Sequence, residues 1–215
     1  MRIEPLGDAA FIVRGLGSGP AFPYVEVLQR LGLAGVVEVV ASYDTLGVYV
    51  DPDQFSLSEL ASRLESLPVS SHAAVGKLHE VPVCYELGED LERCCEELGL
   101  SESAFVGLHS GREYLCYAVG FAPGFPYLGY LPKEVSGLSR LPAPRRSVPA
   151  GAVGVMGDQT GIYPGGRPGG WRLVGATPLE IVSLDDSYFP IKAGDRVVFS
   201  PIALAEYESL KGERL

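Results

Sequence analysis

The sequence predicts an α+β protein of two domains, an α/β domain over residues 1–76 and a mainly antiparallel β domain over residues 77–215. Two observations predict this class. In the first third of the chain, apolar runs typical of strands alternate with segments of helical periodicity. Residues 120–178 then hold 13 of the 27 glycines and 9 of the 17 prolines. That composition excludes long helices and favours short strands joined by turns.

The first domain is expected to follow the order strand, helix, strand, strand, helix. The predicted elements are a strand at 9–14, a helix at 23–33, a hairpin of strands at 36–41 and 46–50, and a helix at 56–67. Pro23 suits the first turn of its helix, and Ser56 or Ser58 can cap the second helix. With a further strand expected near 77–84, this is a ferredoxin-like order. The small, polar segment 70–76 is the expected boundary.

The second domain is expected to be a β-barrel or sandwich with two helices near its start. Strands are predicted at 79–85, 112–119, 153–156, 171–174, 179–183 and 196–199, and helices at 90–98 and 101–109. Ser101 is the expected cap of the second of these helices. Turn residues separate the later strands at the spacing that is typical of an antiparallel barrel or sandwich.

Composition and charge exclude several classes of protein. The net charge of −10 would repel a nucleic-acid backbone. No apolar run is long enough to span a membrane, and Glu4 and Pro5 interrupt the region where a signal peptide needs its apolar core. We therefore expect a cytoplasmic protein that binds neither nucleic acid nor membrane. The four cysteines form no C-x-x-C pair and the three histidines are scattered, so reduced thiols and no metal site are expected.

The arginines of the Gly/Pro-rich segment form a local excess of positive charge. Residues 140–172 hold five arginines, with Asp158 as their only acid, so this segment carries +4 within a chain of −10. Guanidinium groups bind carboxylate and phosphate through paired hydrogen bonds, and glycines can leave backbone N–H groups free for an anion. The pattern predicts an anion-binding surface. The alternative is that these arginines pair with acids of the N-terminal half or of a partner chain.

Two loops of the same segment are candidate binding surfaces. Residues 157–172 combine hydrogen-bonding side chains, six glycines and the only tryptophan, Trp171, which together are typical of a binding loop. The alternative is that the glycines only turn corners and the aromatic residues only fill the barrel. Residues 121–132 alternate aromatic residues with proline and glycine, and this stiff apolar loop would line a pocket or dock a partner.

Catalytic chemistry cannot be assigned from a named motif. The sequence contains no P-loop, no G-x-S-x-G elbow and no H-E-x-x-H pair. His109, which precedes the Gly/Pro-rich segment, is a candidate acid–base group, although a lone histidine is more often structural.

Two long blocks of sequence resemble one known family. Residues 120–129, Gly-Phe-Ala-Pro-Gly-Phe-Pro-Tyr-Leu-Gly, resemble a block of the PxpB/KipI family, whose members are described as the B component of 5-oxoprolinase or as allophanate hydrolase subunit 1. A second block runs from Pro144-Arg145 through Gly157-x-Gln159-Thr160-Gly161 to Pro168-Gly169-Gly170-Trp171 and is similar to the longest signature of that family. Ala152 departs from it, because a serine commonly follows the preceding glycine.

This resemblance implies a cyclophilin-like antiparallel β-barrel for the second domain. It also implies a complex with a PxpC/KipA-like subunit and a PxpA-like subunit that opens the lactam of 5-oxoproline, a small-molecule substrate, to glutamate. ATP with Mg is expected in the complex, and no cofactor is assigned to this chain alone. The alternative is a KipI-type regulator that binds and inhibits a sensor histidine kinase.

The site expected from the residues and from this resemblance lies between Gly120 and Pro178. Its expected substrate- or nucleotide-binding residues are Arg145, Arg146, Gln159, Thr160, Tyr163, Arg167, Trp171, Arg172 and Phe125.

Overall fold

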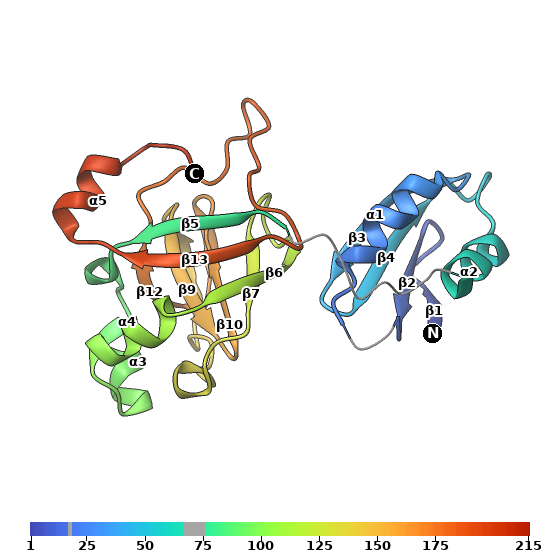
Figure 1. Cartoon of the computed structure of the whole chain (residues 1–215). Helices are drawn as coiled ribbons and strands as arrows, with labels where there is room; N and C mark the ends of the chain where they lie inside the picture. The colour runs from blue at the N-terminus through green and yellow to red at the C-terminus, as the bar shows by residue number, and fades with distance from the viewer. Residues whose placement is uncertain (17–18, 67–75) are drawn as a thin grey trace. The chain divides into compact units, whose positions relative to one another are not determined.

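The computed structural model describes residues 1–16, 19–66 and 76–215, and the chain divides into two units, Met1–Val75 and Gly76–Leu215. The first unit is a four-stranded antiparallel sheet with two helices (Figure 1). Its elements are β1 (Arg2–Pro5), β2 (Ala10–Arg14), α1 (Phe22–Leu31), β3 (Val36–Ser42), β4 (Thr45–Val50) and α2 (Leu57–Ser66). Leu28 of α1 and Leu60 of α2 are buried in one core with the apolar face of the sheet.

Local signals explain the ends of these elements. A proline lies in the first turn of α1, and the helix ends at Gly32, which adopts the left-handed conformation that glycine accepts without strain. The Oγ of Ser56 accepts the backbone N–H of Glu59, as expected of a cap for α2. Ser42 pairs with Thr45 across the tight turn that joins β3 to β4.

The ferredoxin-like order expected for this unit is not confirmed. The sheet has the order β1-β2-β4-β3, and β1, which the sequence did not indicate, occupies one edge. The strand expected near 77–84 does form, as β5 (Leu78–Val83), but it pairs with a strand of the second unit. Local pattern indicates that a segment is a strand, whereas its pairing depends on distant residues. Of the expected boundary at 70–76, residues 70–75 lie outside the described residues.

The second unit is a seven-stranded sheet that curls into a nearly closed barrel (Figure 1). Besides β5 its strands are β6 (Glu113–Val119), β7 (Pro126–Gly129), β9 (Ala152–Met156), β10 (Gln159–Ile162), β12 (Arg172–Ala176) and β13 (Arg196–Pro201), in the order β12-β9-β10-β7-β6-β13-β5. Cys84, directly after β5, exchanges two backbone hydrogen bonds of 2.8 and 3.0 Å with Ala176 of β12. This bridge joins the two ends of the sheet.

The barrel closes through a close approach of two backbones. A Cβ on Gly88 would lie 2.4 Å from the carbonyl of Val174, and one on Gly175 would lie 2.7 Å from a methyl of Val83. Only glycine fits at both positions, because real Cβ atoms do not come this close to other atoms.

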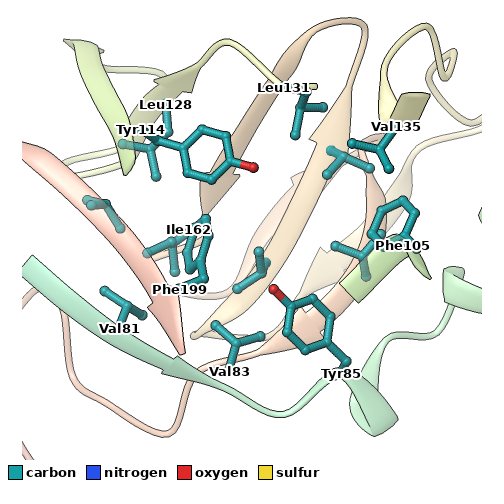
Figure 2. Packing of buried hydrophobic residues seen from close by; sticks show 14 of the residues in the cluster. Val81, Val83, Tyr85, Phe105, Tyr114, Leu128, Leu131, Val135, Ile162 and Phe199 are labelled. Atoms are coloured by element: carbon teal, nitrogen blue, oxygen red, sulfur yellow. The ribbon is translucent and has the colours of Figure 1, made fainter. Parts of the chain in front are cut away.

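Helices and a separate ribbon complete the second unit. They are η1 (Tyr85–Leu87), α3 (Leu91–Leu98), α4 (Glu102–Ser110), η2 (Lys133–Val135), α5 (Leu204–Leu210) and the two-stranded ribbon of β8 (Arg145–Val148) and β11 (Arg167–Gly169). The Oγ of Ser101 accepts the N–H of Ala104 and caps α4. Figure 2 shows Tyr85, Phe105 and Phe199 in the barrel core, where side chains from strands and helices interdigitate.

Two expectations for the second domain need correction. The barrel is not entirely antiparallel, because β5 and β13, its first and last strands, pair in parallel over six residues (Figure 1). The strand expected at 179–183 is absent as a regular element; Glu180 and Ser183 form only isolated bridges, with Arg214 and Tyr188. These two residues pair with the C-terminal segment and with their own turn, and not with the barrel.

Candidate functional site

The two sequence blocks of the Gly/Pro-rich segment meet as neighbouring strands. β7, from the first block, pairs antiparallel with β10, from the second block, and Tyr127 lies opposite Gly161. Both strands were expected to be loops. A Cβ on Gly161 would lie 2.8 Å from the ring of Phe125, so this glycine lets the ring lie directly against the sheet. The blocks thus form one structural site.

Phe125 is the centre of an aromatic cluster at this site. This residue is 1% exposed, and its ring packs edge-on against the rings of Phe121, Tyr127, Tyr163 and Trp171, with centroid distances of 4.9 to 5.5 Å. Such edge-to-face pairs stabilise beyond the area that they bury. Tyr163 and Trp171 are also buried, whereas Phe121 is 63% exposed. The predicted binding residues Phe125, Tyr163 and Trp171 are therefore brought together, as the framework of the site.

Two hydroxyl groups belong to this cluster. Burial raises the pKa of Tyr163, and a hydrogen bond with the backbone of Trp171 and the charge of Arg140 partly oppose the shift. Burial also raises the pKa of Tyr127, again against the charge of Arg140. Both phenols are therefore protonated donors at neutral pH, and both lie within the electrostatic reach of Arg140.

His109 is part of the barrel core and has every polar atom satisfied. Its Nδ1 lies 2.7 Å from the hydroxyl of Tyr85, and its Nε2 lies 3.0 Å from Oγ1 of Thr160. Thr160 donates its own proton to the carbonyl of Gly154, so Nε2–H of the neutral imidazole must be the donor to Thr160. Complete burial lowers the pKa of His109 to about 3. These contacts give His109 and Thr160 a structural role.

Two of the predicted anion-binding arginines already bind carboxylates of this chain. Nη2 of Arg145 lies 2.8 and 2.9 Å from the carboxylate oxygens of Asp90, and its Nε lies 3.1 Å from Glu89. Nη2 of Arg172 lies 3.0 and 3.1 Å from the carboxylate oxygens of Glu97. For these two arginines the alternative interpretation holds, since they pair with acids of the N-terminal half. Both pairs hold the region of α3 against β8 and β12.

The remaining arginines of the segment face solvent. Arg146 and Arg167 lie on the β8–β11 ribbon, and Arg140 lies in the loop before it. All three are exposed, and none forms an ion pair with a carboxylate in the described part of the chain. Arg167 pairs with Val148, two residues from Arg146, so two like charges lie on neighbouring positions of one ribbon. Gln159 is half-buried at the start of β10.

Sequence reasoning missed the acids and one tyrosine. Asp90 was assigned only to the start of a helix, yet it is 8% exposed and also accepts the N–H of Leu173 at 2.7 Å. A buried aspartate requires partners, but nothing local identifies an arginine 55 residues away. Tyr127 was counted only as an aromatic residue of the first block.

Two properties of the described residues bear on other kinds of site. Over residues 1–16, 19–66 and 76–215, no group of three His, Cys, Asp or Glu side chains lies close enough together to hold a metal ion. Within the same ranges, no helix has the length and apolar character that crossing a membrane requires.

Comparison with known proteins agrees with this architecture. Residues 1–187 match the family model described as "Carboxyltransferase domain, subdomain C and D", which defines the class of the protein. The solved structure of TTHA0988 is 37% identical, with a TM-score of 0.80, and the match covers 90% of this chain and 40% of that longer chain. This chain thus spans two fifths of TTHA0988.

Within that class, the chain belongs to the PxpB family, the B components of 5-oxoprolinase. The B component of 5-oxoprolinase from Bacillus subtilis (strain 168) is 32% identical over 236 residues, covering 99% of this chain and 97% of that protein. The B component from Escherichia coli O157:H7 is 39% identical over 183 residues, covering 82% of this chain and 83% of that protein. The resemblance of the two sequence blocks to the PxpB/KipI family is confirmed.

Proposed function

We propose that this chain is a non-autonomous subunit of an ATP-dependent 5-oxoprolinase, which opens the lactam of 5-oxoproline to give glutamate. The relatives named as 5-oxoprolinase subunits support the enzyme class, since one of them matches 99% of this chain. The observation that carries the proposal is that the two sequence blocks join at Phe125, in one cluster with Val148 of the β8–β11 ribbon, whose exposed Arg146 and Arg167 have no carboxylate partner among the described residues. We include in this proposal that the chain is cytoplasmic and that its barrel is cyclophilin-like.

The partners of this proposal are a PxpC/KipA-like subunit and a PxpA-like subunit. The word "subunit" in the names of the relatives supports a complex, and this chain spans only 40% of TTHA0988, where it corresponds to part of a longer chain. The aromatic cluster is open on one side at Phe121, which is 63% exposed. A site that is open on one chain is suited to completion by a second chain.

The anion-binding role falls on the exposed arginines. Arg146 and Arg167 place two positive charges on the paired strands of one ribbon, and one anion could accept hydrogen bonds from both. We assign these two residues, with Gln159 at the rim, to the phosphates of ATP or to an acidic group. Mg would accompany ATP in the complex. Phe125, Tyr163 and Trp171 share a buried cluster with Val148 of β8 and support the ribbon, whereas Thr160 belongs to the barrel core. Arg145 and Arg172 hold α3 in place.

The test is reconstitution with the two partner subunits, followed by measurement of ATP-dependent glutamate release. We expect glutamate release, and the double variant Arg146→Ala with Arg167→Ala should lower it by about tenfold or more. The matched control is Arg30→Ala with Arg63→Ala, since both of these exposed arginines lie on helices of the first unit. Unchanged rates in the first variant would remove the arginine assignment. A complete complex without activity would overturn the function.

A KipI-type inhibitor of a histidine kinase is the second function considered from the sequence. The named relatives do not favour it, because both carry the name of an enzyme subunit. Pull-down against kinase dimerisation domains separates the two roles, because inhibition requires binding that is independent of ATP and 5-oxoproline.

A further inference from the structure

The backbone on either side of Arg140 is held against the short connection between β11 and β12, which contains the only tryptophan of the chain. The carbonyl of Ser139 accepts the Nε–H of Arg172 at 3.0 Å, and the N–H of Leu141 donates to the carbonyl of Gly170 at 2.8 Å. Gly170 and Arg172 flank Trp171 in the sequence. Arg140 is therefore fixed alongside Trp171 by two hydrogen bonds, one on each side.

Because Gly170 has no side chain, the side chain of Arg140 can begin directly beside the connection between β11 and β12. A Cβ on Gly170 would lie 3.9 Å from Cβ of Arg140, which is ordinary van der Waals contact. The stem of Arg140 thus begins directly beside the residue before Trp171. The ring of Tyr127 also packs against Trp171, with a centroid distance of 5.9 Å. The backbone of an exposed arginine and the ring of a half-buried tyrosine therefore both lie close to Trp171 or to the residues that flank it.

The charge of Arg140 has no acidic partner in the described residues, unlike the charges of Arg145 and Arg172. It acts on both phenols of the cluster, because it opposes the rise that burial causes in the pKa of Tyr127 and of Tyr163. A guanidinium on a fixed backbone, near a phenol donor and without a carboxylate partner among the described residues, presents hydrogen-bond donors to an anion.

We propose that Arg140 and the hydroxyl of Tyr127 bind the carboxylate of a small organic acid, whose apolar body lies against the aromatic cluster. This inference rests on the proposed function for the choice of acid, 5-oxoproline, which carries one carboxylate on a compact lactam ring. Arg140 was not among the predicted site residues. The carboxylate position at Arg140 is therefore distinct from the anion position that we assign to Arg146 and Arg167 on the β8–β11 ribbon.

Trp171 provides a direct readout, because it is the only tryptophan and its ring packs against both Phe125 and Tyr127. The purified chain is titrated with 5-oxoproline, with 2-pyrrolidinone, which is the same lactam without the carboxylate, and with inorganic phosphate. We expect a saturable change in tryptophan fluorescence with 5-oxoproline only. Arg140→Gln should weaken this binding by about tenfold or more, and Arg140→Lys should weaken it less.

Arg63→Gln is the matched control, because Arg63 is exposed and lies in the first unit. Both arginines are on the surface, so an unchanged denaturation midpoint will show that each variant folds. Equal binding by the wild type and by Arg140→Gln would overturn the proposal. So would an equal response to 2-pyrrolidinone, or a response to phosphate with the same dependence on Arg140.

Reconstituted complexes distinguish this inference from the proposed function. In an active complex, Arg140→Gln should raise KM for 5-oxoproline and leave KM for ATP unchanged. If KM for 5-oxoproline and KM for ATP both stay at their wild-type values, the proposed carboxylate site is wrong, and the proposed function is unaffected. If the wild-type complex releases no glutamate but Trp171 still reports carboxylate binding that depends on Arg140, the function is wrong and the site stands.

Discussion

Arg172 of β12 donates through Nη2 to both carboxylate oxygens of Glu97 on α3, at 3.0 and 3.1 Å. The arginine side chain is 6% exposed and the glutamate side chain 37%, so the pair joins a buried cation to a partly solvated anion. Removing the cation leaves a void in the protein and a carboxylate that water can still solvate in part. The pair thus connects a helix to the barrel wall beside the aromatic cluster.

Arg172→Ala should lower the free energy of unfolding by about 2–4 kcal/mol, because a buried, hydrogen-bonded partner is lost together with its packing. Arg93→Ala is a matched control, since Arg93 binds the same Glu97 from a side chain that is 66% exposed. Its cost should be about 0.5 kcal/mol or less. Urea denaturation checks both values, and equal losses would contradict the structural role of Arg172.

His109 should make the protein sensitive to acid. Burial lowers its pKa from the ordinary 6.5 to about 3 in the folded state. Between these two pH values the unfolded chain binds a proton at this site and the folded chain does not. The free energy of unfolding therefore falls as the pH is lowered through this window, by at most about 1.4 kcal/mol per pH unit from this group. His109→Gln should flatten the dependence, measured by urea denaturation at pH 7 and pH 5. The same slope in both proteins would show that His109 titrates normally.

Gly88→Ala should destabilise the closure of the barrel. The new methyl group would lie 2.4 Å from the backbone carbonyl of Val174. Neither backbone segment can move away without disturbing the hydrogen bonds between Cys84 and Ala176 that join the two edges of the sheet. We expect a loss of about 2–3 kcal/mol. Gly107→Ala is the control: this glycine lies within α4, has open space around its Cβ position and should gain up to about 1 kcal/mol of helix stability. Thermal unfolding of the two variants should move in opposite directions.

The four cysteines should be inert in the folded protein. All four are free and buried, and burial raises the pKa of Cys94 and of Cys116 to about 12 each. Because the thiolate is the nucleophile, an aromatic disulfide reagent at pH 8 should react with none of them until denaturant is added. Rapid modification of a thiol under native conditions would contradict this prediction.

The sequence predicted the elements whose signals are local. The helix α4 follows its cap Ser101, and α1 has a proline in its first turn, so each boundary depends on nearby residues. By contrast, β7 and β10 lie in a stretch rich in glycine and proline, where propensity argues against regular structure. They are strands because each pairs with neighbours on both sides in the barrel.

The sequence predicted which region of the chain holds the candidate site, but not which of its side chains contact one another. The residue types expected to wall a pocket, Phe125 and Trp171, do assemble, but as a buried framework. Arg145 and Arg172 were expected to bind ligands because their acids lie 55 and 75 residues away, a distance at which no sequence pattern reveals a pair. Arg140 is distinguished by the opposite property, a backbone position fixed by hydrogen bonds and a charge without an acidic partner among the described residues.

The parallel pairing of β5 with β13 sets the order in which the two units can be completed during synthesis. All four strands of the first unit lie between Arg2 and Val50, so its sheet can form as soon as that segment leaves the ribosome. The barrel cannot close at that stage. β13 lies between β5 and β6, so both strands keep an unpaired edge until residues 196–201 emerge. The first strand of the second unit therefore waits for the last strand of its barrel to be synthesised before it finds its partner.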